Sequence, residues 1–339
     1  MCYLTLVMKA KEKEPLTLQE AIKYFGNPDN CLNYIAARRW RDGIVRCPSC
    51  GSDQVSFIPT RRLWECKAKH EKRQFSVKVG TVMEDSPIGL DKWLCAFWMI
   101  ANCKNGVSSY EIHRAVGVTQ KSAWFMLHRI RLAMQDGPYI HKLGGPGTEV
   151  EVDESFVGGK MSNMHSRKRN RIVHKAGTSG AVETKTIVMG FLDRDLRKIR
   201  TEIVPTTSRV VLQSQVFKHV AHHTNLYTDQ SSAYQSLNEH PFVHRVVNHL
   251  ETYVKGRVHT NGLENFWSLL KRHLAGTYVA VEPFHLFRYL DEQVFRYNNR
   301  ATRDNPLNDS DRFDLAVSQI VNKRLTYAEL TGKVGETIN

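Results

Sequence analysis

The stretch TEVEVDESFVGG, at residues 148–159, constrains the fold of this chain more than any other part of its sequence. Val150 and Val152 alternate with polar residues, which is the pattern of a strand with one buried face. This short strand carries Asp153 at its end, where a carboxylate is available to bind a metal ion. We therefore expect a sheet with a functional acidic residue at the end of this strand.

Two later segments carry acidic residues that could meet Asp153. In NLYTDQSSAY, Asp229 follows another short apolar run, and in HTNGLENFWSLLKR, Glu264 lies near the start of a predicted helix. Two-metal phosphoryl transfer requires carboxylates that hold Mg²⁺ or Mn²⁺ ions roughly 3.5 to 4 Å apart. If the three acids converge, the chain is a metal-dependent nuclease or polynucleotidyl transferase.

Each acid also has an ordinary structural explanation. Asp153 and Asp229 could form turns at strand ends, and Glu264 could complete a capping box with Asn261. Only the combination of these acids with the features described below favours the metal site.

A second cluster of metal ligands lies in RCPSCGSDQVSFIPTRRLWECKAKH. Cys47 and Cys50 form a C-x-x-C knuckle, and Cys66 with His70 supplies a second pair, the spacing of a zinc ribbon. Four protein ligands close a tetrahedral Zn²⁺ site, so this site is expected to be structural. The alternatives are a redox-active C-x-x-C pair and a surface role for His70.

Residues 86–140 have the pattern of a helical region with helix-turn-helix spacing. Ser108 or Ser109 can cap a first helix, Gly117 permits the turn, and Thr119 can cap a second helix. The second helix of such a motif enters the major groove of DNA, and its nearest candidates for contact are Gln120, Lys121 and Trp124. A plain helical hairpin is the alternative.

Net charge indicates the partner class. The 48 Lys and Arg residues against 34 Asp and Glu residues give a formal net charge of +14, which attracts polyanions. Nucleic acid is the expected partner, although a ribosomal or membrane-surface protein can carry a similar charge.

Cysteine use and hydropathy indicate the compartment. Seven cysteines in 339 residues are too few and too unevenly spaced for a secreted disulfide framework. The N-terminal apolar run precedes the basic residues, which is the wrong order for a signal peptide. No uncharged apolar run reaches the roughly 18 residues needed to cross a bilayer. We therefore expect no membrane association and a cytoplasmic location.

Composition shifts and linkers divide the chain into five parts. We expect a helical lead-in at 1–45, a zinc ribbon at 46–85, the helix-turn-helix-like region at 86–140, a catalytic domain at 146–300, and a less ordered C-terminal tail at 301–339. A linker rich in Gly and Pro near residue 140 separates the two halves. In the catalytic part strands come first and helices follow, which predicts an α/β (α+β) fold.

Several blocks together carry a family likeness. The order CPSCG, Cys66, His70 and RQFSVKVGTVMEDSPI, followed by VDESFVGGK, TDQSSAY and HTNGLENFWSLLKR, resembles the zinc-ribbon DDE transposases of bacterial insertion sequences, the ISXO-like group. The resemblance extends from about Cys47 to Arg300. It implies a ribonuclease H-like core in which Asp153, Asp229 and Glu264 bind two Mg²⁺ or Mn²⁺ ions, with Asn261 as the alternative third ligand.

The resemblance also implies a reaction and its partners. The enzyme would bind the terminal inverted repeats of its element, cut them, and join the 3′-hydroxyl to target DNA as at least a dimer. Lys271, Arg272 and the basic loop 167–171 are candidates for phosphate contact. The competing hypothesis is a non-catalytic regulator that binds DNA through the ribbon and the helical pair.

Overall fold

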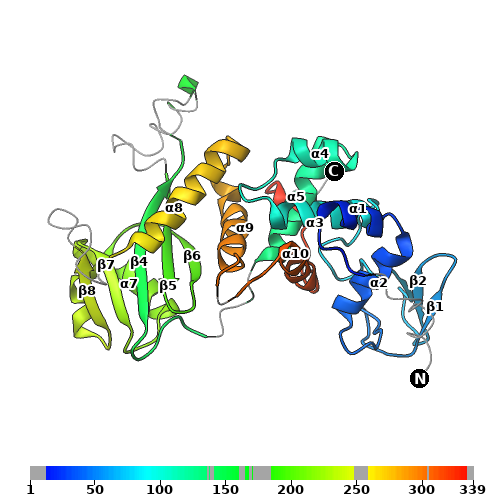
Figure 1. The fold of residues 1–339 in the computed structure, drawn as a ribbon, viewed down its shortest axis with the longest axis horizontal. Helices are drawn as coiled ribbons and strands as arrows, with labels where there is room; N and C mark the ends of the chain where they lie inside the picture. The colour runs from blue at the N-terminus through cyan, green and yellow to red at the C-terminus, as the bar shows by residue number, and fades with distance from the viewer. Residues whose placement is uncertain are drawn as a thin grey trace. The chain divides into compact units, whose positions relative to one another are not determined.

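The computed structural model describes residues 13–135, 137, 141–159, 165–167, 170, 185–247, 259–303 and 305–333. The chain divides into two compact units, whose helices and strands are labelled in Figure 1. Unit 1 combines Met1–Gln135 with Asn299–Asn339, and unit 2 is Asp136–Asn298.

Unit 1 contains a small antiparallel sheet and a set of helices. The sheet has the order β1-β2-β3, with strands Val55–Ile58, Leu63–Cys66 and Gln74–Phe75. The helices are α1 (Leu18–Phe25), α2 (Pro28–Arg39), α3 (Leu90–Asn102), α4 (Ser109–Val116), α5 (Gln120–Met134), α10 (Asp309–Ser318) and α11 (Tyr327–Leu330).

Local sequence signals set the ends of the first two helices. Thr17 and Glu20 form a capping box at the start of α1. The break between α1 and α2 lies at Gly26 and Asn27, where Asn27 caps α2 and Pro28 occupies its first position. The helical lead-in expected from the sequence is therefore present in residues 18–39.

The C-terminal segment differs from the less ordered tail expected from the sequence. Helix α10 packs against α3, where Phe313 lies fully buried against the ring of Trp98. Phe313 also stacks on Tyr34 of α2. The contacts that order this segment come from residues more than 200 positions earlier, so local sequence patterns do not reveal them.

Unit 2 is built on a five-stranded mixed sheet with the order β6-β5-β4-β7-β8. Its strands are β4 (Glu149–Val157), β5 (Thr186–Asp193), β6 (Lys198–Val204), β7 (Asn225–Asp229) and β8 (Val243–Val247). Its helices are α7 (Arg209–His219), η2 (Ser232–Glu239), α8 (Asn261–His273), the π-helical turn η3 (Leu274–Tyr278), η4 (Pro283–His285) and α9 (Leu286–Asn298). Strand β4 runs antiparallel to β5 and parallel to β7, and β7 runs parallel to β8.

Both faces of this sheet are covered by helices, which gives unit 2 a layered mixed α/β architecture. Val150 and Val152 of β4 pack with α7 and η2 on one face. On the other face, Leu263, Phe266 and Trp267 of α8 pack with α9 and with alternate residues of β5. Figure 1 shows α8 lying across the strands. Because side chains alternate along a strand, the α8 face also receives Glu151 and Asp153 of β4.

Candidate active site

The register of the sheet brings Asp153 and Asp229 together. Strands β4 and β7 pair in parallel, with Glu151 opposite Tyr227. The pairing of the two strands ends at this pair, and Asp153 and Asp229 each lie two residues beyond it, with Asp229 as the last residue of β7. The charge of Asp229 nevertheless acts on Asp153. Residues opposite one another in neighbouring strands project from the same face of a sheet. Both carboxylates therefore belong to the face covered by α8.

Helix α8 adds Glu264 to this pair. Its side chain is exposed, and its negative charge acts on Asp153 together with that of Asp229. The capping position of α8 is occupied by Thr260, whose side chain makes no capping hydrogen bond, and Asn261 is the first residue of the helix, not its cap as the alternative explanation required. Asn261 is exposed.

Burial and neighbouring charge perturb the acids of β4. Burial raises the pKa of Asp153 to about 6, and the charges of Asp229 and Glu264 add to the rise, against the hydrogen bond from Trp267. Burial also raises the pKa of Glu154 to about 8, with contributions from Asp153 and Asp229. A shared negative field at half-buried carboxylates is typical of a site that receives a cation.

A tryptophan fixes the orientation of Asp153. The indole N–H of Trp267 on α8 donates a hydrogen bond to Oδ2 of Asp153, at 2.9 Å. Gly190 of β5 lies opposite Asp153 and makes room for this ring, because a Cβ at Gly190 would lie 2.7 Å from Cζ2 of Trp267. The close approach of α8 to the sheet thus depends on a glycine.

Asp229 combines a structural and a potential ligand role. Its Oδ1 accepts a hydrogen bond from the backbone N–H of Ser231, at 3.2 Å, so the turn expected at this strand end is present. In the described chain, the oxygens of the three acids do not all lie within 4.8 Å of one another. The acids are therefore electrostatic neighbours in an open arrangement.

Sequence reasoning missed Glu154 and Trp267. Glu154 directly follows Asp153, and alternation alone assigns its side chain to the opposite face of the sheet. One of its carboxylate oxygens, Oε1, is buried and has no hydrogen-bond partner among the described residues. Trp267 is three residues after Glu264, one turn along α8, and this spacing was the signal that could have identified it.

Two basic residues occupy the last turn of α8. Lys271 and Arg272 are both exposed there, and Lys271 lies two turns after Glu264 on the same side of the helix. The expected basic loop 167–171 falls largely outside the described residues. Arg167 is one of its described residues and is exposed.

The four expected zinc ligands lie together in unit 1. The ligand atoms of Cys47, Cys50, Cys66 and His70 all lie within 4.8 Å of one another. Sγ of Cys47 lies 3.4 Å from Nε2 of His70, and Sγ of Cys50 lies 3.6 Å from Sγ of Cys66. Bonds of about 2.3 Å to sulfur and 2.0 Å to nitrogen in a tetrahedron imply separations of about 3.5 to 3.8 Å. The cluster therefore fits a structural Zn²⁺.

The local backbone explains how these ligands meet. Gly51 has φ +74°, a conformation that suits glycine, and its N–H donates to the carbonyl of Cys47 to close the knuckle. Cys66 ends β2, where it pairs with Val55 of β1. The ribbon strands therefore hold the second pair of ligands against the first.

The helical pair in unit 1 has the expected caps. Ser108 caps α4 in a capping box with Glu111, Gly117 ends α4 in the left-handed conformation, and Thr119 caps α5. Gln120 donates a hydrogen bond to Oγ of Ser109, and the exposed Lys121 lies 4.7 Å from the ring centre of Tyr327.

Helix α5 is accessible only near its start. Its residues from Met126 to Met134 are buried, while Trp124 is half-buried. A DNA contact by α5 is therefore limited to its first turns, where Gln120 and Lys121 lie.

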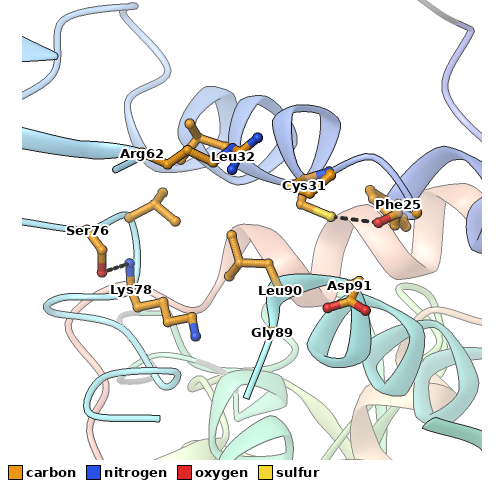
Figure 2. Close-up of a pocket in the computed structure, with 12 residues that line it drawn as sticks. Phe25, Cys31, Leu32, Arg62, Ser76, Lys78, Gly89, Leu90 and Asp91 are labelled. Atoms are coloured by element: carbon orange, nitrogen blue, oxygen red, sulfur yellow. Dashed lines mark hydrogen bonds between the residues drawn. The ribbon is translucent and has the colours of Figure 1, made fainter. Parts of the chain in front are cut away.

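Unit 1 also contains a cavity of about 320 Å³ beside α2 and the start of α3 (Figure 2). Lys78 lines it and donates to the carbonyls of Ser86 and Ile88, and burial lowers its pKa. Cys31 lines the cavity as well, and its Sγ hydrogen-bonds to the carbonyl of Phe25. Both groups are thus engaged by backbone carbonyls.

None of the described helices is both long enough and apolar enough to cross a membrane.

Comparisons with known proteins agree with the arrangement of both units. Residues 142–298 match the model of the ISXO2-like transposase domain, and residues 26–70 match that of the transposase zinc-ribbon domain. The chain is 30% identical over 261 residues to an uncharacterized protein in transposable element ISH50 of Halobacterium salinarum, which covers 75% of this chain and 85% of that protein. It is also 30% identical over 102 residues to an uncharacterized transposase-like protein of Haemophilus influenzae, covering 30% of this chain and 82% of that protein.

Proposed function

Because this chain belongs to the ISXO2-like transposase family, we propose that it cuts the ends of an insertion element and joins them to target DNA by metal-dependent phosphoryl transfer. The observation that carries the proposal is that the charges of Asp229 and Glu264 both act on the buried carboxylate of Asp153, on the sheet face that α8 covers. The mixed sheet with helices on both faces supports a ribonuclease H-like core.

The donor set fits hard divalent cations. Three carboxylates suit Mg²⁺ or Mn²⁺, which prefer oxygen ligands. Bound there, such ions supply activation of the attacking oxygen and stabilisation of the leaving oxygen. The hydrogen bond from Trp267 fixes one oxygen of Asp153, and the Ser231 N–H fixes one oxygen of Asp229.

The remaining proposed roles concern DNA. Lys271 and Arg272 are exposed on the helix that carries Glu264, and we assign them to phosphate contact beside the reacting bond. In unit 1, the zinc ribbon with Gln120 and Lys121 would bind the terminal inverted repeats. The net charge of +14 supports binding of DNA by the whole chain. Joining two element ends requires at least a dimer on DNA.

Substitution of the acids tests the proposal. Asp153→Asn and Asp229→Asn should each reduce Mg²⁺-dependent nicking of a duplex carrying the element's terminal repeats by at least about 10³-fold. Binding of the same duplex should stay within about threefold of wild type, because neither acid contributes positive charge. Nicking is followed on a labelled duplex, and binding by fluorescence anisotropy.

The nicking and binding assays also distinguish this proposal from the alternatives. Wild-type activity in either variant would remove that acid from the mechanism. A wild-type protein that binds the repeats and never nicks them with Mg²⁺ or Mn²⁺ would favour the non-catalytic regulator. Glu264→Gln and Asn261→Ala, compared in parallel, identify the third ligand.

A further inference from the structure

A buried carboxylate outside the proposed ligand set contacts the start of α8. Glu151 of β4 is fully enclosed, with 1% of its side chain exposed, and it projects from the same sheet face as Asp153. Its Oε2 accepts a hydrogen bond from the backbone N–H of Leu263, at 2.9 Å. Leu263 is the residue immediately before Glu264.

This contact replaces the missing side-chain cap of α8. The first N–H groups of a helix have no partner within the helix, and a negative group there is favourable. Thr260, at the capping position of α8, makes no side-chain capping bond. Glu151 therefore supplies from a neighbouring strand the acceptor that a capping residue ordinarily supplies from within the helix.

An arginine holds Glu151 in place. Nε of Arg194 donates to Oε1 of Glu151, at 2.6 Å, and Nη1 of the same residue lies 3.2 Å from Oε2 of Glu149. Nη2 of Arg194 donates to the carbonyl of His259, in the segment that leads into α8. Arg194 thus connects β4 to the chain just before the helix, and both oxygens of Glu151 are engaged.

The glycine at the second position of α8 is adapted to this contact. A Cβ at Gly262 would lie 2.9 Å from Oε2 of Glu151 and 2.3 Å from Cδ2 of Leu192. A side chain there would displace either the carboxylate of Glu151 and the end of Leu192 or the start of the helix. Glycine at position 262 lets the helix start approach the carboxylate without such a displacement.

We infer that Glu151 is a positioning residue that fixes the start of α8 on β4 and so sets Glu264 relative to Asp153. The inference rests on the proposed function, because Glu264 needs a defined position only as a metal ligand. Glu151 takes no part in the chemistry, since both of its oxygens are occupied by Leu263 and Arg194. Groups that orient metal ligands typically change metal affinity or activity by about 10- to 100-fold when lost.

The test measures Mn²⁺ binding by calorimetry in the whole protein, together with the Mn²⁺ dependence of nicking. Glu151→Ala should weaken Mn²⁺ binding about 10- to 100-fold. Glu151→Gln should lose less Mn²⁺ affinity. Its amide oxygen can still accept the hydrogen bond from the Leu263 N–H, although the negative charge that pairs with Arg194 is gone. Gly262→Ala should weaken Mn²⁺ binding by displacing the same helix start, although Glu151 is intact.

Glu292→Gln is the matched control. Glu292 is also a fully buried carboxylate paired with an arginine, Arg296, and it contacts His273 at the opposite end of α8. Its substitution should lower the melting temperature while Mn²⁺ affinity stays within about twofold of wild type.

The outcomes separate the two proposals. Wild-type Mn²⁺ affinity in Glu151→Ala would overturn this inference alone. If the alanine variant does not fold, Glu151→Gln is measured in its place, and the same result has the same meaning. Equal loss of affinity in Glu292→Gln would also overturn it, because the effect would then be general to the helix. A wild-type protein that binds no Mn²⁺ would overturn the proposed function, and this inference with it.

Discussion

At the scale of single residues, Asp153 is the position where stability and the proposed function oppose each other. Its pKa rises from 3.8 to about 6 through burial, with the charges of Asp229 and Glu264 adding to the rise. Near neutral pH the carboxylate is ionised in the folded protein, at a cost in free energy that a bound cation would offset. Natural active sites commonly contain such unfavourable charges.

Asp153→Asn should therefore stabilise the metal-free protein at pH 8 by about 1–3 kcal/mol, from about 1.4 kcal/mol per unit of pKa shift. The sign follows from the raised folded pKa. The ionised carboxylate costs nothing below pH 3.8, costs progressively more up to about pH 6, and costs its full amount above that pH.

Chemical denaturation of the wild type and the variant at pH 8 and pH 4 measures this difference. The variant should be more stable at pH 8, and the advantage should nearly disappear at pH 4. A variant less stable than wild type at pH 8 would show that the Trp267 hydrogen bond outweighs the burial of charge.

At the scale of elements, local sequence patterns predicted the strands and helices, but they did not predict which elements contact one another. The alternation of Val150 and Val152 predicted β4, but the strand continues to Val157, so Asp153 lies in its middle and not at its end as predicted. Asp229 does end β7, and Glu264 does lie in the first turn of α8. The cap that Glu151 provides for Leu263 joins residues 112 positions apart. The sequence of α8 does not indicate that contact. It shows at most that Thr260 makes no capping bond, and not which distant residue replaces it.

Gly190→Ala tests how closely α8 must approach the sheet. The new Cβ would lie 2.7 Å from Trp267 and 2.9 Å from Leu263, closer than real Cβ contacts allow. Overpacking of this kind typically costs about 1–3 kcal/mol of stability. The nicking rate should fall by more than the loss of folded protein explains, because the displaced Trp267 no longer fixes Asp153.

Thermal melting and the nicking assay, performed on the same preparation, measure both effects. Gly276→Ala is a control, since a Cβ there meets no atom within 4 Å. Unchanged nicking in a destabilised Gly190→Ala protein would show that the Trp267 contact serves packing alone.

At the scale of the whole molecule, the chain forms two units, and the first unit is assembled from both ends of the sequence. The linker near residue 140 predicted a division close to the observed one at Gln135. The return of residues 299–333 to the first unit was not predictable, because the partners of Phe313 lie in α2 and α3. The zinc ligands, by contrast, were recognisable from spacing, since all four lie within 24 residues.

Loss of the zinc cluster should therefore affect the first unit selectively. Cys47→Ser removes one of four ligands, so the zinc content of the purified protein should fall and the ribbon should lose stability. Binding to the terminal repeats should weaken, while Mn²⁺ binding by the acids of the second unit should persist. Zinc analysis, anisotropy and calorimetry measure the three quantities.

Cys31→Ser provides the matched comparison, because it replaces a buried thiol of the same unit that is not among the ligands. Burial raises the pKa of Cys31 to about 12, so it remains a neutral thiol, and a serine hydroxyl can keep its hydrogen bond to Phe25. This variant should retain its zinc and its affinity for DNA. If Cys47→Ser also kept both, the cluster would have neither a metal-binding nor a DNA-binding role. If it lost Mn²⁺ binding as well, the two units would depend on each other for folding.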